Sequence, residues 1–194
     1  MRIISGIYKG LKNNSKLPKG IRPTQDAMRE TIFNVLNNYV DFNNTIVADV
    51  CAGTGMLGIE ALSRGAKFSY FVDKSRNSIE YIRNSLHSFH IPVENYQLNN
   101  LDVLQFLNHI DYKNTNSDNP TLIDILFVDP PYNTSIVNEI FFYVENKKIM
   151  NQNGIIVAET SIQNLFYINK SFETITERQF GAAKVIFAKQ INIS

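Results

Sequence analysis

Residues 45–65 read TIVADVCAGTGMLGIEALSRG, and this stretch decides the fold. TIVADV is a short apolar run typical of a buried strand, whereas GMLGIEALSRG has helical spacing and ends at Gly65. The glycines between them let the chain turn tightly from strand to helix, and they let a ligand approach the bare backbone. Taken alone, the turn is compatible with a dinucleotide site or with a sharp turn that binds nothing.

Strand and helix signals alternate after this stretch. Further strands are predicted at residues 67–73, 95–99, 122–129, 154–160, 172–179 and 184–190, and helices at 78–89, 103–110 and 136–146. This order predicts an α/β fold with a mostly parallel, seven-stranded sheet that helices cover on both faces. Little chain separates the last two strands, so they are expected to pair as an antiparallel hairpin. A length of 194 residues fits a single domain.

Composition excludes several classes of protein. The hydrophobic content of 44% is ordinary for a globular chain, and no apolar run approaches the ~20 residues of a membrane span. The N-terminus lacks the apolar core of a signal peptide, so a cytoplasmic location is expected. Cys51 is the only cysteine, which excludes an internal disulfide and a thiol-based zinc site. The three histidines fall in or directly after predicted helices, so we expect no metal site. A monomer is also expected.

The N-terminal segment is basic although the net charge is only +1. Its basic residues, with no acidic residue among them, are Arg2, Lys9, Lys12, Lys16, Lys19 and Arg22. Alternating apolar residues in RIISGIYKG and the turn residues of KLPKGIRPT favour a β-hairpin. One-signed charge is typical of a phosphate-binding surface, and residues 1–23 are therefore predicted to be an RNA-binding arm. A solvated, flexible N-terminus explains the charge equally well.

A helix is predicted to follow the arm, with Thr24 as its N-cap and Asp26 in its first turn. Its apolar residues recur at helical spacing and should pack on a core. Arg29 lies off this stripe and is predicted to face the ligand side.

Two carboxylates flank the glycine turn and favour S-adenosylmethionine over a dinucleotide. Asp49 stands four residues before Gly53, where it could hold an ammonium group through water and would repel a pyrophosphate. Asp73 ends the next strand, about 20 residues beyond the glycines, and is placed to accept hydrogen bonds from ribose hydroxyls. A solvated strand end is the alternative for Asp73.

Asp102 follows the third strand, where an adenine amine could be recognised, although it could equally start a helix. Asn100 and the backbone of Leu101 compete for the same role. The complete predicted cofactor set is Asp49, Ala52, Gly53, Thr54, Gly55, Asp73, Lys74 and Asp102.

The fourth strand ends in Asp129-Pro130-Pro131-Tyr132. Ligands of open α/β sheets collect at the carboxyl ends of strands where the strand order reverses, and the first and fourth strands should be neighbours there. An aromatic exocyclic amine is a poor nucleophile, because its lone pair is delocalised into the ring. The Asp129 carboxylate and the Pro130 carbonyl could accept hydrogen bonds from the two N–H groups of such an amine. Consecutive prolines would hold the carbonyl still. Tyr132 could stack on the base.

D-P-P-Y has the form of the (N/D/S)-P-P-(Y/F/W) motif of amino-methyltransferases. More narrowly, the chain resembles the RsmD family of bacterial methyltransferases, nearly from end to end. The segments that carry this resemblance are Met1-Arg2-Ile3-Ile4-Ser5-Gly6 with Lys9-Gly10, Arg22-Pro23-Thr24 with Asp26, Arg29-Glu30-Thr31-Ile32-Phe33-Asn34, Gly53-Thr54-Gly55 with residues 57–65, and Val128-Asp129-Pro130-Pro131-Tyr132.

The resemblance implies a Rossmann-like class I methyltransferase fold with an N-terminal hairpin that engages RNA. It also implies methylation of a guanine N2 in 16S ribosomal RNA, presented within an assembled small subunit. The predicted RNA contacts are Arg2, Lys9, Lys12, Arg22, Thr24 and Arg29. Three alternatives remain open: adenine-N6 methylation of RNA or DNA, a non-catalytic ribosome-assembly factor, and a nucleotide-dependent oxidoreductase.

Overall fold

The computed structural model describes residues 1–17, 24–118, 120–131, 136–147, 149–164, 168 and 170–191. Its strands are β1 Ile46–Val50, β2 Phe68–Val72, β3 Tyr96–Asn99, β4 Ile123–Val128, β5 Met150–Ser161, β6 Phe172–Phe180 and β7 Ala183–Gln190. Its helices are α1 Asp26–Leu36, α2 Met56–Ser63, α3 Arg76–Ser88, α4 Val103–Thr115 and α5 Ile136–Glu145, with a 3₁₀ turn at Val93–Asn95.

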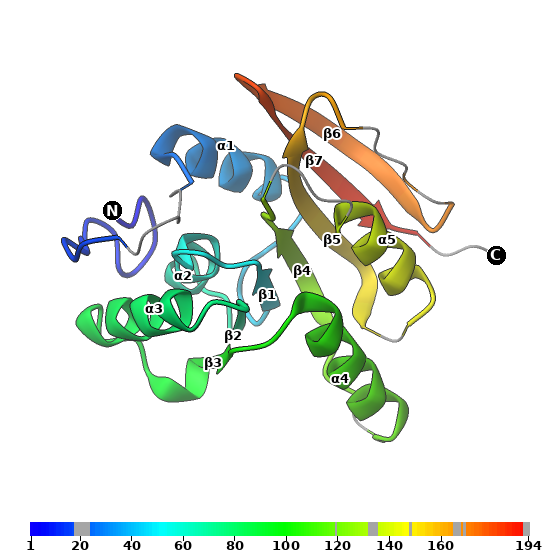
Figure 1. Ribbon diagram of the computed structural model, residues 1–194, viewed down its shortest axis with the longest axis horizontal. Coiled ribbons are helices and arrows are strands. Elements are labelled where there is room, and N and C mark those ends of the chain that lie inside the picture. The colour runs from blue at the N-terminus through cyan, green and yellow to red at the C-terminus, as the bar shows by residue number, and fades with distance from the viewer. Residues whose placement is uncertain are drawn as a thin grey trace.

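The strands form one seven-stranded sheet in the order β3-β2-β1-β4-β5-β7-β6 (Figure 1). β1 pairs in parallel with β2 on one side and with β4 on the other, so that Asp49 lies opposite both Phe71 and Phe127. The strand order reverses between β1 and β4, which confirms that these two strands are neighbours. The carboxyl ends of both strands therefore open onto the same edge of the sheet.

The C-terminal strands complete the sheet as a hairpin. β7 runs antiparallel to both β5 and β6, and it lies between them. The predicted mostly parallel sheet with an antiparallel C-terminal hairpin is confirmed. None of the described helices is long and apolar enough to cross a membrane.

Helices cover both faces of the sheet, each over its own apolar core. One core joins α1, α2 and α3 to the sheet, with Phe33, Ile59 and Leu86 fully buried. The other joins α4 and α5 to the opposite face, through side chains such as Phe106 and Ile140. Alternating side chains of the central strands serve the two cores, because successive residues of a strand point to opposite faces. The sheet is thus held rigidly where the site forms.

The N-terminal hairpin is formed by residues 1–13 and is docked on α2 (Figure 1). Arg2 and Lys12 form an antiparallel bridge, which confirms a hairpin but places it earlier than the second half of the predicted arm. The buried Glu60 carboxylate of α2 accepts hydrogen bonds from the amides of Ile4 (2.8 Å) and Ser5 (2.9 Å). The hairpin is therefore part of the packed structure and not a free tail.

Gly6 shows how closely the hairpin approaches α2. Its φ is +85°, and a Cβ at this position would lie 1.7 Å from the carbonyl oxygen of Ser63. The Ser63 carbonyl and hydroxyl accept hydrogen bonds from the amides of Ile7 (2.7 Å) and Tyr8 (3.0 Å). Only glycine fits such a contact, because any side chain would push the hairpin away.

Two element boundaries differ from the sequence predictions. Gln25 and not Thr24 is the N-cap of α1, and it makes no side-chain capping bond. α4 runs on to Thr115, beyond residue 110, where the sequence predicts the helix to end. The Asn114 side chain exchanges two hydrogen bonds with the backbone of Thr121, of 3.0 and 2.9 Å, and so joins the end of this helix to the segment that leads into β4.

Candidate active site

The site is built on the turn that connects β1 to α2. Cys51, Gly53 and Gly55 all have positive φ, of 58°, 52° and 71°. The turn is closed by a hydrogen bond from the Gly55 amide to the Ala52 carbonyl (2.6 Å), and Thr54 is buried beneath it. Left-handed conformations in quick succession expose bare backbone at the carboxyl edge of the sheet. This is the surface on which the sequence predicts a cofactor.

α2 leaves this turn packed closely against the sheet. A Cβ on Gly58 would lie 2.4 Å from the Phe71 ring of β2, so a larger residue would force the helix outward. Gly55, the N-cap, has no side chain to satisfy the first amides of the helix. The Asp49 carboxylate does so from β1, accepting a hydrogen bond from the Gly58 amide at 2.9 Å.

Asp49 is almost fully buried, with 1% of its surface exposed. Burial raises the pKa of Asp49 well above its usual value, because a carboxylate is poorly solvated in the protein interior. The Gly58 hydrogen bond opposes this shift of the pKa, and the charges of Asp129 and Asp73 add to it. A cation beside Asp49 would remove this penalty, so the residue is suited to an ammonium group.

Asp73 holds the glycine turn from β2. Its Oδ2 accepts a hydrogen bond from the Gly53 amide and its Oδ1 accepts one from the Ser75 amide, both at 2.8 Å. The Asn100 side chain donates to the carbonyls of Asp73 (2.9 Å) and Lys74 (3.0 Å). The ends of β2 and β3 are thereby joined around the predicted ribose position. Asn100 takes a structural part there that the sequence does not reveal.

Asp102 lies exposed at the start of α4. Its Oδ1 accepts a hydrogen bond from the Leu104 amide (2.9 Å), and its carbonyl accepts one from Phe106 (3.0 Å). Of the two roles that the sequence left open, the structure provides the helix start. Contact with a base remains a prediction.

The Asp129-Pro130-Pro131 turn follows β4 directly beside the glycine turn. The Asp129 amide lies 3.5 Å from the Val50 carbonyl of β1, and Asp129 Oδ2 accepts a hydrogen bond from the Thr24 hydroxyl at 3.3 Å. Pro130 is buried and Pro131 is exposed. Tyr132, which the sequence predicts to stack on a base, lies outside the described residues.

Acidic groups dominate the field at this edge. Burial raises the pKa of the Cys51 thiol to about 12, with further contributions from the charges of Asp73, Asp129, Asp49 and Asp102. The thiol is therefore protonated at neutral pH and is a poor nucleophile. The same field would repel a pyrophosphate and attract a cation, which counts against a dinucleotide.

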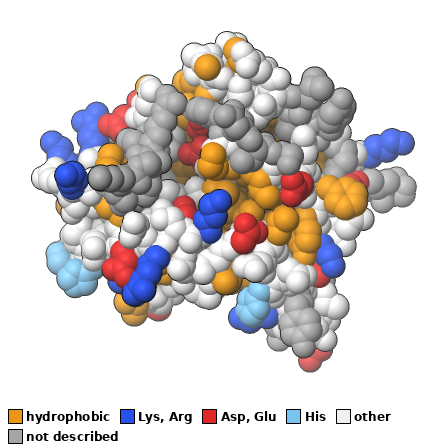
Figure 2. Space-filling view, viewed as in Figure 1, with side chains coloured by type: hydrophobic (Ala, Val, Ile, Leu, Met, Phe, Trp, Pro, Cys, Tyr) orange, Lys and Arg blue, Asp and Glu red, His pale blue; other side chains and the backbone are white. Residues whose placement is uncertain are grey.

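The predicted RNA contacts divide into exposed and buried residues. Arg2, Lys9 and Lys12 are exposed on the docked hairpin, and Figure 2 shows Lys and Arg side chains on the side where Figure 1 has the hairpin. Arg22 lies outside the described residues. Thr24 is partly buried, with its hydroxyl directed at Asp129.

The prediction of a direct RNA contact for Arg29 is wrong, because its side chain is fully buried. Its guanidinium donates to the carbonyls of Thr24 (3.1 Å) and Arg2 (2.7 Å) and to Asp26 Oδ1 (3.0 Å). Burial lowers its pKa, and the charges of Asp26 and Glu60 oppose the shift. Arg29 instead ties α1 to the hairpin.

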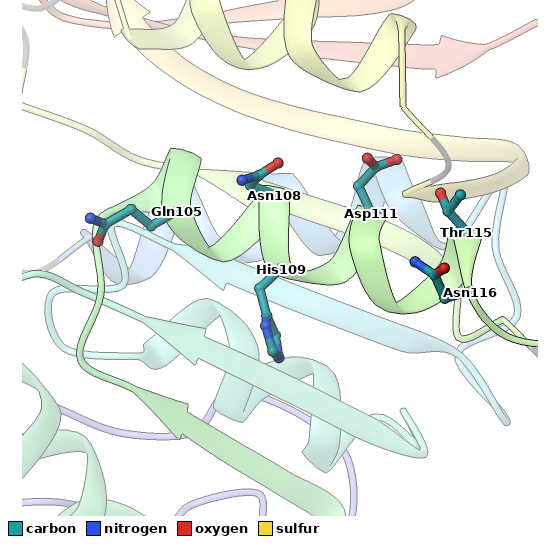
Figure 3. A pocket seen from close by; sticks show the side chains of 6 residues that line it. All are labelled: Gln105, Asn108, His109, Asp111, Thr115 and Asn116. Carbon is teal, nitrogen blue, oxygen red and sulfur yellow. The ribbon is translucent and has the colours of Figure 1, made fainter.

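A polar groove along α4, shown in Figure 3, contains none of the predicted site residues. It is lined by Gln105, Asn108, His109, Asp111, Thr115 and Asn116. Asp111 pairs with Lys147 (3.1 Å), and Asn108 accepts a hydrogen bond from Tyr143 (2.7 Å). These contacts join α4 to α5 and to the residues that follow it, and we assign the groove no function.

Solved structures agree with this architecture. A putative methyltransferase, yhhF from Escherichia coli, has a TM-score of 0.81 at 26% identity, with 98% of each chain covered. A putative methyltransferase solved in complex with SAH has a TM-score of 0.68 at 17% identity, over 83% of this chain and 49% of that one. The protein has the Rossmann-like class I methyltransferase fold, as predicted.

The chain belongs to the family described as conserved hypothetical protein 95, whose model matches residues 1–189. It is 32% identical over 171 residues to ribosomal RNA small subunit methyltransferase D of Buchnera aphidicola subsp. Acyrthosiphon pisum. This alignment covers 88% of this chain and 83% of that protein. It is 31% identical over 159 residues to the putative rRNA methyltransferase YlbH of Bacillus subtilis, covering 82% of each. The predicted membership of the RsmD family is confirmed.

Proposed function

We propose that this protein transfers a methyl group from S-adenosylmethionine to the exocyclic N2 amine of a guanine in 16S ribosomal RNA, within the assembled small subunit. The observation that carries the proposal is the Asp129-Pro130-Pro131 turn, which lies beside the glycine turn at the reversal point of the sheet. Relatives named ribosomal RNA small subunit methyltransferase D support it. Residues 1–194 act as one methyltransferase domain, as a monomer in the cytoplasm.

The acidic edge suits this cofactor. When bound, S-adenosylmethionine supplies an electrophilic methyl group on a sulfonium cation, and S-adenosylhomocysteine is the product. Asp49 holds the ammonium end, through water, and Gly53 and Gly55 leave the backbone open beside it. Asp73 accepts from the ribose hydroxyls, since each carboxylate oxygen can accept a second hydrogen bond besides the backbone one. Ala52, Thr54, Lys74 and Asp102 complete the proposed cofactor contacts.

The amine is oriented by the turn after β4. The Asp129 carboxylate and the Pro130 carbonyl accept hydrogen bonds from its two N–H groups. These two hydrogen bonds direct the nitrogen lone pair toward the methyl group. Pro130 is buried and Pro131 restricts it further, so the carbonyl is held in place before the substrate arrives. Methyl transfer is a direct displacement, in which the N–CH3 bond forms as the S–CH3 bond breaks, S-adenosylhomocysteine leaves and the methylated nitrogen then releases one proton to solvent. No covalent enzyme intermediate is needed, consistent with the protonated Cys51 thiol. Tyr132 stacks on the base.

RNA is held by the N-terminal arm through Arg2, Lys9, Lys12 and Arg22. The first three are exposed, and no acidic residue occurs between Met1 and Arg22. Docking on α2 fixes these charges relative to the site, so a bound RNA would be positioned as well as attracted.

The decisive experiment is methyl transfer from labelled S-adenosylmethionine to unmodified small ribosomal subunits, with naked 16S RNA and DNA alongside. Nucleosides of the digested product are identified by mass spectrometry. We expect N2-methylguanosine, formed preferentially on subunits. Methyladenine would overturn the acceptor and keep the mechanism, whereas cofactor binding without any transfer would favour a non-catalytic assembly factor.

The role of Asp129 has its own test. Asp129→Ala should lower kcat by at least about 10²–10³-fold, because a preorganised polar group at the reacting amine is lost. Cofactor affinity, measured by calorimetry, should stay within a few-fold. Glu94→Ala, at an exposed position, is the matched control and should keep full activity. Near-normal turnover in Asp129→Ala would refute the mechanism.

A further inference from the structure

A polar network with a buried arginine at its centre runs from the N-terminal hairpin to the catalytic turn. Its centre is the guanidinium of Arg29, which bonds the carbonyls of Arg2 and Thr24 and the Asp26 carboxylate. Asp26 also pairs with the Arg2 side chain at 3.2 Å. The buried Nε of Arg29 has no hydrogen-bond partner among the described residues, and moving any of the three partners would leave still more of the charge unsatisfied, so the guanidinium is an anchor. The backbone of Thr24 is therefore held in one place.

Thr24 connects the Arg29 network to the Asp129 side chain. Its hydroxyl donates to Asp129 Oδ2 at 3.3 Å, a contact between residues 105 positions apart in the sequence. Thr24 is not the N-cap of α1, so its hydroxyl is not engaged in starting the helix. Neither helix capping nor contact with an RNA phosphate accounts for this hydrogen bond to Asp129.

We propose that Thr24 is a positioning residue that orients the Asp129 carboxylate for the acceptor amine, with Arg29 holding Thr24 in place. The inference rests on the proposed function. A carboxylate rotates easily about its terminal torsion, whose energy profile is broad. The hydrogen bond from the anchored Thr24 hydroxyl restricts the rotation of the Asp129 carboxylate. The carboxylate can then accept from the amine without first having to rotate. Misplacement of a reacting group by about 1 Å can cost ~10²-fold in rate.

The test compares Thr24→Val with Thr24→Ser by single-turnover and steady-state methylation of small subunits. Valine keeps the shape and loses the hydroxyl, whereas serine keeps the donor. We expect Thr24→Val to lower kcat by about 10- to 100-fold, the usual consequence of losing a hydrogen bond to a charged group. The KM for S-adenosylmethionine should stay within a few-fold. Thr24→Ser should restore kcat to within about threefold of the wild type, since a hydroxyl donor is regained.

A double-mutant cycle separates this role from a structural one. In the Asp129→Ala background the side-chain acceptor is gone, and Thr24→Val should then lower the residual kcat by less than about threefold, because the two changes remove the same interaction. Thr31→Val is the matched control, since the Thr31 hydroxyl donates a hydrogen bond within α1, to the Ala27 carbonyl at 2.9 Å. It should keep the wild-type kcat.

Three results would overturn the inference: an unchanged kcat in Thr24→Val, failure of serine to restore it, or an equal cost in both backgrounds. Weaker subunit binding at unchanged kcat would identify Thr24 as an RNA contact instead. If the wild type methylates no RNA, the proposed function fails and this inference fails with it. If the wild type is active and only the Thr24 comparisons disagree, the proposed function stands.

Discussion

Replacing Asp49 by asparagine should uncouple cofactor binding from pH. Asparagine keeps an oxygen that can accept the Gly58 hydrogen bond, so the start of α2 is preserved. It removes the only titrating group at this position. In the wild type the pKa of Asp49 is raised by burial in the free protein. A bound ammonium group would lower this pKa again, because it stabilises the charged carboxylate.

The difference between the pKa of Asp49 in the free protein and in the complex determines how cofactor affinity depends on pH. Between the pKa of Asp49 in the complex and its higher pKa in the free protein, cofactor binding expels one proton. Affinity should therefore rise with pH in this window, by up to about tenfold per pH unit for one proton, and level off above the pKa of the free protein. Asp49→Asn should show no such slope and should bind more weakly at neutral pH.

Stability should change in the opposite direction. A carboxyl group whose pKa is raised in the folded state binds more protons folded than unfolded. The stability of the wild type should thus fall as pH rises from 3.8, the usual pKa, toward the pKa of the folded state. Asp49→Asn does not lose stability in this way as the pH rises. Without cofactor, the variant should therefore be at least as stable as the wild type at neutral pH.

Calorimetric titration with S-adenosylmethionine, in two buffers of different ionisation enthalpy, measures both affinity and proton release. The pH should stay below about 7.5, because an α-amino group loses its proton near 7.7–8.0. Glu94→Gln, which removes an exposed carboxylate outside the proposed site, is the control and should keep the slope. The reasoning is refuted if Asp49→Asn retains the wild-type slope, or if it unfolds at a lower urea concentration at neutral pH.

Two further predictions concern the N-terminal hairpin. Gly6→Ala should undock it, because the added Cβ meets the Ser63 carbonyl and φ is +85°; the left-handed conformation alone costs about 1–2 kcal/mol. Faster amide exchange confined to the hairpin would be the signature, and unchanged protection would contradict the packing described. Lys9→Glu combined with Lys12→Glu should weaken RNA binding and reduce the slope of log affinity against log salt by about 1.5, without changing cofactor affinity. Lys113→Glu, on α4, should change neither, and an unchanged slope in the double variant would remove the hairpin lysines from the RNA interface.

Local sequence determined the framework of the protein. Apolar runs and helical spacing report burial at short range, and they predicted all seven strands and the five helices in order. The glycine turn, Asp73 and Asp129 each lie within a few residues of a strand end. Since the carboxyl ends of parallel strands meet at one edge, their assembly into one site followed from the topology alone.

Only the tertiary structure decided the roles of residues whose partners are distant in sequence. Arg29 reads as a surface arginine because charged residues are rarely buried, yet its partners Arg2 and Thr24 enclose it. Glu60 lies in an otherwise apolar helix, and only the docked hairpin shows what it binds. Thr24 matched a helix cap in sequence, whereas its hydroxyl meets Asp129 across the fold. The cost of burying a polar group depends on which partners surround it, and that information exists only once the chain has folded.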